Sequence, residues 1–123
     1  MTIDTWGASA DSLVVTTVTI ANGGSVSGAA PAASLHLVGI QMPAAWTAAA
    51  LTFQGSADGV TFNDAYDNNG AEINVQAAAS RYIAIPPTLL ARVPALYVRS
   101  GTTGTPVAQG GARVLTLIFA RYQ

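Results

Sequence analysis

The sequence predicts an all-β fold, an antiparallel β-sandwich or jelly roll of about eight short strands. Apolar and polar residues alternate in short runs, and no stretch shows the period of a long helix. Turn-forming residues, mainly Gly, Asn, Asp and Pro, separate these runs. A chain of 123 residues is long enough for one domain with a sizeable core. We therefore expect a single sandwich domain over residues 1–123, with the N-terminal ~10 residues as an extended arm.

Eight segments are predicted as strands, because each is short, rich in β-branched or aromatic residues and bounded by turn residues. They are residues 12–20, 35–41, 51–55, 60–66, 72–76, 81–85, 95–100 and 112–122. Residues 21–34 are a loop by composition. Residues 44–50 and 88–92 are each predicted to form no more than one helical turn, because such short segments do not sustain a helix.

Two turns are predicted from dipeptide chemistry. Asp58-Gly59 lies between two alternating runs, which indicates a tight hairpin turn with Gly59 at positive φ. Residues 67–70 (Asp-Asn-Asn-Gly) form the second turn, because Asn and Gly tolerate positive φ. Phe53, Phe62 and Phe119 occupy inward strand positions and are predicted to lie in the core.

The chain carries few charges. Its 5 Arg and 6 acidic residues make 9% of the sequence, against roughly 25% in an average soluble protein, while 50% of residues are hydrophobic. We therefore expect the isolated chain to self-associate or to need a partner. Nucleic acid is not an expected partner, because the net charge is −1. A membrane is not expected either, because the apolar runs are far shorter than the ~20 residues that span a bilayer.

The sequence offers little catalytic or metal-binding chemistry. It has no Cys, and its only histidine, His36, stands between two leucines in a predicted strand, without a nucleophile-elbow motif elsewhere. We therefore expect no enzyme activity and no cofactor. The acids at positions 58, 64, 67 and 72 are interpreted as solvated turn residues, with paired carboxylates for glycoside chemistry as the alternative.

Residues 63–72 are rich in side-chain oxygen atoms, so we considered them as a calcium-binding loop. With Gly70 at the sixth position of a calcium loop, Ala65 would stand first and Gln76 twelfth, and neither supplies the required carboxylate. A non-standard calcium site stays open, beside a plain β-turn.

The last strand is apolar on both faces. Leu115, Leu117 and Phe119 lie on one face, Val114, Ile118 and Tyr122 lie on the other, and Arg113 and Arg121 bracket the first. A two-layer sandwich covers only one face of each sheet, so we expect the less buried face to contact another chain. The candidate protein-contact residues are Trp6, Trp46, Arg113, Leu117, Ile118 and Arg121.

The two tryptophans lie in predicted irregular segments. Interface anchoring and core packing are the common roles of Trp, and stacking on a sugar is the alternative. The charges are also uneven, because all 6 acids precede residue 81 and all 5 Arg follow residue 80. Pairing of acidic and basic strands within one fold explains this layout, and so does complementarity between subunits.

Two resemblances add to this interpretation. Residues 53–62 (Phe-Gln-Gly-Ser-Ala-Asp-Gly-Val-Thr-Phe) resemble the Ser-x-Asp-Gly-x-x-aromatic hairpin of discoidin-like jelly rolls. Residues 81–85 (Arg-Tyr-Ile-Ala-Ile) resemble the strand that follows in those domains. The chain lacks the disulfide cysteines that those domains carry, and no binding residue is carried over.

The second resemblance covers about residues 35–122. Residues 37–47 followed by the Ser-x-Asp-Gly hairpin, with residues 99–102, 106–109 and 113–121, are similar to small accessory virion proteins of tailed bacteriophages. The resemblance implies a structural virion protein, foremost a head decoration (cement) protein that contacts the major capsid protein or other virion proteins as a homo-oligomer. The alternative is a carbohydrate- or receptor-binding module of a phage tail or fibre.

Overall fold

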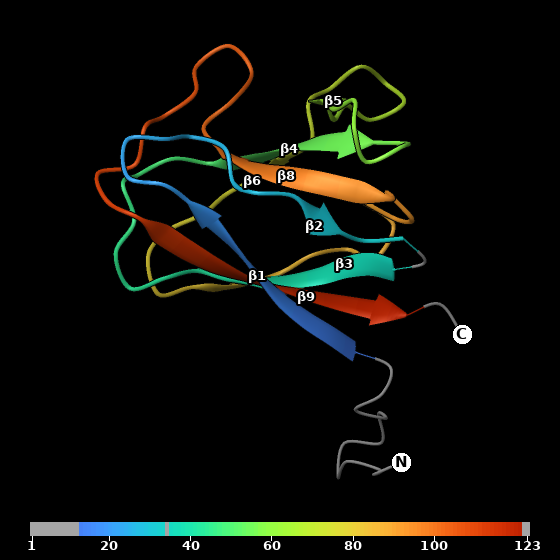
Figure 1. The fold of residues 1–123 in the computed structure, drawn as a ribbon, viewed down its shortest axis with the longest axis horizontal. Helices are drawn as coiled ribbons and strands as arrows, with labels where there is room; N and C mark the ends of the chain where they lie inside the picture. The colour runs from blue at the N-terminus through green and yellow to red at the C-terminus, as the bar shows by residue number, and fades with distance from the viewer. Residues whose placement is uncertain (1–12, 34, 122–123) are drawn as a thin grey trace, which may run out of the picture.

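The computed structural model describes residues 13–33 and 35–121, which fold as a sandwich of two antiparallel sheets (Figure 1). The described residues contain nine strands and no helix that could cross a membrane. The strands are β1 (Leu13–Ile20), β2 (Ala30–Pro31), β3 (Leu35–Gln41), β4 (Leu51–Ser56), β5 (Asn63–Asp64), β6 (Asn74–Val75), β7 (Tyr82–Ala84), β8 (Ala95–Ser100) and β9 (Arg113–Arg121).

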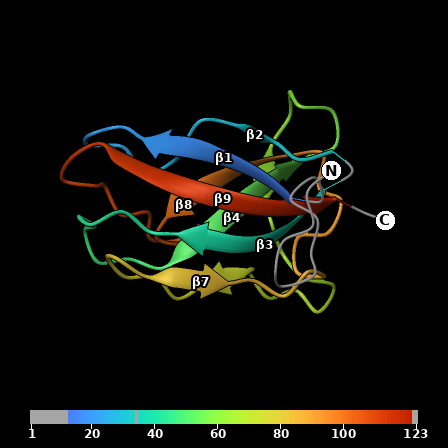
Figure 2. The same cartoon turned by 90° about the horizontal axis from the view of Figure 1, so that it is seen from below.

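The first sheet has the strand order β1-β9-β3-β7, and Figure 2 shows it nearest the viewer. The second has the order β2-β8-β4-β5, with β6 also paired to β4. All of these pairs are antiparallel. The register of β3 on β9 shifts between Leu37 and Gly39, which marks a β-bulge at Val38. Both edges of β9 are therefore paired, with β1 on one side and β3 on the other, and β1 forms one edge of the sheet.

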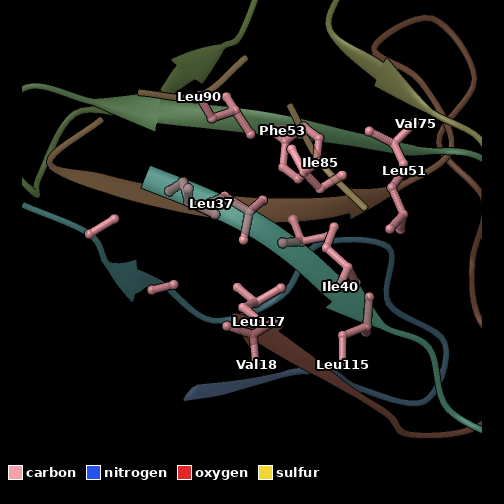
Figure 3. Close-up of a cluster of buried hydrophobic side chains, with 14 of the residues drawn as sticks. Val18, Leu37, Ile40, Leu51, Phe53, Val75, Ile85, Leu90, Leu115 and Leu117 are labelled. Carbon is pink, nitrogen blue, oxygen red and sulfur yellow. The ribbon is translucent and has the colours of Figure 1, made fainter. Parts of the chain in front are cut away.

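The core lies between the two sheets, whose inward side chains point toward one another (Figure 3). From the first sheet come Leu37, Ile40, Leu115 and Leu117, and from the second come Leu51, Phe53, Leu96 and Val98, all fully buried. The alternation in β9 is regular, because Leu115, Leu117 and Phe119 are buried while the residues between them are not. This pattern confirms the β-sandwich and the inward placement of Phe53 and Phe119.

Several predicted strands are shorter than expected. The named strands cover Asn63–Asp64 within residues 60–66, Asn74–Val75 within 72–76 and Tyr82–Ala84 within 81–85, while Tyr66 and Glu72 form an isolated bridge. The predicted loop 21–34 contains β2, which was missed because two residues carry no alternation. Residues 44–50 contain no helical turn, whereas a turn does form at residues 87–90, where Leu89 N–H donates to the Pro86 carbonyl.

The β4–β5 hairpin confirms the positive φ of Gly59, at 79°. Its loop is wider than a two-residue turn, because pairing stops at Gly55 and Asn63. The Asp58 carboxylate fills this loop by accepting the N–H groups of Val60 and Thr61 at 2.8 and 2.9 Å. The Thr61 and Val60 N–H groups stabilise the charged carboxylate, which lowers the pKa of Asp58 below 3.8.

Candidate protein-interaction face

The outer surface of the β1-β9-β3-β7 sheet is the candidate site. The strand registers place one set of side chains on this surface, which we call the open face. Its members are Leu13, Val15, Thr17 and Thr19 of β1; Val114, Thr116, Ile118 and Ala120 of β9; His36, Gly39 and Gln41 of β3; and Tyr82 and Ala84 of β7. None of them is Asp, Glu, Lys or Arg. An uncharged sheet face of this composition is typical of a surface that another molecule covers.

The open face combines exposed apolar side chains with uncharged polar ones. Val15 and Tyr82 keep 63% and 56% of their accessible surface, and Leu13 and Val114 are also exposed. Figure 2 shows no described segment lying across this sheet. With ~3.3 Å per residue and ~4.8 Å between strands, the four strands present a flat area on the order of 400 Å². That area lies within the range of the largest apolar patches on monomeric proteins, which are often functional.

The bulge in β3 shapes the centre of this face. Gly39 lies opposite Ile118 on one side and Ala84 on the other. A Cβ atom at Gly39 would lie 2.2 Å from the hydroxyl oxygen of Tyr82, so the tyrosine ring extends over the glycine. Glycine is needed here because the aromatic ring takes the space of its missing side chain.

The outer surface of the second sheet is different, because the chain covers it with its own loops and a polar cluster. Arg99, only 4% exposed, projects from β8 on this side. Its guanidinium donates to Asp64 at 2.6 Å and to Glu72 at 2.7 Å, and its Nε donates to Thr52 Oγ1 at 2.9 Å. Thr103 Oγ1 accepts from Arg99 at 2.8 Å and also bonds Glu72. We call these five residues the Arg99 cluster.

The Arg99 cluster corrects the interpretation of two acids as solvated turn residues. Asp64 and Glu72 are each ion-paired with the buried guanidinium of Arg99, so their carboxylates are partnered within the fold. The hydrogen bond from Arg99 holds the pKa of Asp64 below 3.8, and a second from Gln54 lowers it further. Asp67 is a turn residue as predicted, because its carboxylate accepts from Asn69 and Ala71 N–H. Residues 13–33 and 35–121 contain no group of three His, Cys, Asp or Glu able to hold a metal.

Phe62 is also placed differently from its prediction. It is half-buried, and its ring stacks on Tyr97 with a centroid distance of 4.0 Å. Tyr97 lies level with Gln54 on the outer side of the second sheet. The aromatic pair therefore helps the 57–62 loop to cover that surface, outside the core.

The candidate contacts on β9 separate onto two sides of the sheet. Ile118 is half-buried on the open face, whereas Leu117 is 0% exposed in the core and cannot contact another chain in this fold. Leu117 is therefore removed from the candidate contacts. Arg113 and Arg121 share the inward side of β9 by alternation and lie at its two ends. Arg113 donates to Gln109 Oε1 at 3.1 Å, and Arg121 donates to the Leu13 carbonyl at 3.4 Å.

Of the two tryptophans, only Trp46 lies within the described residues, and it is not part of the open face. Trp6 lies outside the described residues. Trp46 is half-buried against the core, and its indole N–H donates to the Ala49 carbonyl at 3.1 Å. The same loop is fixed by Gln109, which exchanges hydrogen bonds of 2.8 and 3.0 Å with the backbone of Thr47. Sequence reasoning missed this buried glutamine, because its partner lies 62 residues away.

Comparison with protein-family models, curated proteins and solved structures finds no match to this chain.

Proposed function

We propose that the chain is a structural virion protein of a tailed bacteriophage, foremost a head decoration protein, that attaches through the open face. The observation that carries the proposal is the contrast between the two outer surfaces. One is covered by loops and the Arg99 cluster, while the other exposes Val15, Val114 and Tyr82 without a single Asp, Glu, Lys or Arg. Apolar residues left at the surface of one sheet are stabilised when a partner covers them.

The strand pairing supports the proposal at the level of the fold. Setting β6 aside, eight strands remain, and the first pairs with the last, the second with the seventh, the third with the sixth and the fourth with the fifth. We infer a jelly roll from this nested pairing. Viral capsid proteins and lectins both use that architecture, so the fold favours a virion or a sugar-binding role by analogy alone.

The alternative, a carbohydrate- or receptor-binding module of the tail, has weaker support. Sugar binding needs exposed aromatic rings with polar neighbours, and Trp46 packs against the core instead. Tyr82 is the only Phe, Tyr or Trp among the members of the open face; it lies opposite Gln41, and the hydroxyl end of its side chain lies over Gly39. This setting favours a protein partner over a sugar.

The test is the composition of purified phage particles from a genome that encodes the chain. Quantitative mass spectrometry should find it in the particle at hundreds of copies, as expected for a head lattice. A count of three, six or twelve would replace the head role with a tail or vertex role. Complete absence from the particle would refute the virion proposal, and glycan-array binding of the isolated chain would then favour the alternative.

A further inference from the structure

The edges of the two sheets are protected unequally. β7 has three residues, β5 and β6 have two each, and β2 has two residues that include Pro31. Short edge strands and proline are the devices that keep sheets from pairing with other chains. β1 is the fourth edge and has none of them, because it is an eight-residue strand (Leu-Val-Val-Thr-Thr-Val-Thr-Ile) with neither a charge nor a proline.

The unpaired side of β1 can be located from one hydrogen bond. Gly28 N–H donates to the Thr19 carbonyl at 3.3 Å, beside the isolated bridge between Ile20 and Ser27. The Thr19 carbonyl therefore points away from β9, and alternation directs the N–H and C=O groups of Val15 and Thr17 to the same side. Within residues 13–33 and 35–121, no backbone group is hydrogen-bonded to Leu13, Val15 or Thr17 on that side of β1.

We propose that β1 pairs antiparallel with β1 of a second copy of this chain, across a two-fold axis at Val15. In this register Val15 lies opposite its own copy, and Leu13 lies opposite Thr17. Those pairs would exchange about six backbone hydrogen bonds. The Leu13 carbonyl already accepts one long bond from Arg121 and keeps a second lone pair for this contact. The bridge at Ile20 stays intact, because the paired segment ends before it.

A second copy fits this edge better than an unrelated chain for two reasons. A two-fold axis brings identical groups together, and no Asp, Glu, Lys or Arg occurs from Ser12 to Ala57 to repel its copy. The pairing also joins two open faces into one continuous surface, because residues opposite each other point to the same side of a sheet. One open face on the order of 400 Å² becomes about 800 Å², which is the area that one partner contributes to a stable interface.

The inference concerns the edge of the sheet and does not depend on the virion role. Its test uses the purified full chain without any particle. The native chain has no cysteine, so Val15→Cys introduces a single thiol. The two Val15 Cα atoms would lie ~5.5 Å apart in a hydrogen-bonded antiparallel pair, within the range of a disulfide. Two controls carry the thiol elsewhere: Thr17→Cys on the same edge and Val60→Cys in the 57–62 loop, where Val60 is 82% exposed.

Under mild oxidation, Val15→Cys should form the covalent dimer about tenfold faster than either control, because pairing raises the effective concentration of the thiols. Thr17→Cys stays slow, since two-fold pairing at Val15 separates the Thr17 copies by ~14 Å along the strands. Equal rates for all three variants would overturn the proposal. The proposal would also be overturned if Val15→Cys formed no covalent dimer in the full chain and crosslinked only after removal of residues 1–12. Those residues, and not a second copy, would then occupy the edge.

A backbone variant tests the same pairing independently. The Thr17 N–H faces the open edge, so Thr17→Pro removes no bond to β9 and is tolerated in an edge strand. Added to Val15→Cys, it should abolish fast crosslinking while the circular dichroism spectrum stays unchanged. Persistence of crosslinking in this folded double variant would show that the thiols meet without strand pairing.

Discussion

Aspartate substitutions at Leu117 and Ile118 should separate the core side of β9 from its open face. The two residues are adjacent, but Leu117 is 0% exposed and Ile118 is half-buried on the outside. Truncation of a buried leucine costs about 2–5 kcal/mol in free energy of unfolding, before any charge is buried. Burial of an unpaired carboxylate adds several kcal/mol. Since the stability of a domain is about 5–15 kcal/mol, Leu117→Asp should leave the chain unfolded or close to it.

Ile118→Asp should be much milder. The substitution removes about half of the ~1.5–3 kcal/mol that full burial of the side chain contributes. The low strand propensity of aspartate costs up to ~1 kcal/mol more. The free energy of unfolding should therefore fall by about 1–2 kcal/mol. The urea midpoint should fall by about 1 M, because the free energy of unfolding decreases by about 1–3 kcal/mol per M urea. Urea unfolding followed by circular dichroism checks both variants. Equal losses, or a larger loss at Ile118, would refute the assignment of the two faces.

Three further predictions concern the turns and the Arg99 cluster. Gly59→Val should lower the free energy of unfolding by about 1–2 kcal/mol through positive φ alone, because nothing lies within 4 Å of a Cβ there; an unchanged melting temperature would contradict this. Arg99→Met should cost about 3–5 kcal/mol in urea unfolding, because Asp64 and Glu72 lose their buried partner; a loss below 1 kcal/mol would be incompatible with a stabilising cluster. The folded pKa of Asp64 is lowered, so its contribution to stability is present above about pH 4 and is lost as the pH falls through that folded pKa. Asp64→Asn should therefore show a flatter decline in urea stability from neutral to acid pH than the native chain does, and parallel declines would count against the pairing.

The sandwich could be predicted because its long strands obey local rules. Residues 13–20 and 113–121 are long runs rich in β-branched and apolar residues, so the pattern identifies each of them as a strand. The two-residue strands could not be predicted, because their pairing is set by neighbours that are distant in sequence. In residues 60–66, the Asp58 carboxylate accepts the N–H groups of Val60 and Thr61, and the ladder with β4 is limited to Asn63 and Asp64.

The candidate site was predicted in part. The two apolar faces of β9 predicted that one apolar face would stay outside the core, but alternation alone did not say which face was inside. The Arg99 cluster could not be predicted from the sequence, because the carboxylates of Asp64 and Glu72 lie 35 and 27 residues from Arg99 along the chain. One signal for it was present, because Arg99 is the only charged residue of the strand 95–100, and an arginine buried in such a strand is paired. The core packing of Trp46, one of the roles left open for it, could not be selected from the sequence, because an irregular segment can still pack against a core.

The central claim is that the open face attaches the chain to the particle. The most direct measurement is a binding titration of phage particles that lack the chain, with the native protein, Ile118→Asp and Val60→Asp. Val60 is the more exposed residue but lies in the 57–62 loop. The account predicts native affinity for Val60→Asp and a loss of about 30-fold or more for Ile118→Asp, the effect of an interface hot spot. Native affinity for a folded Ile118→Asp, with loss for Val60→Asp, would contradict it.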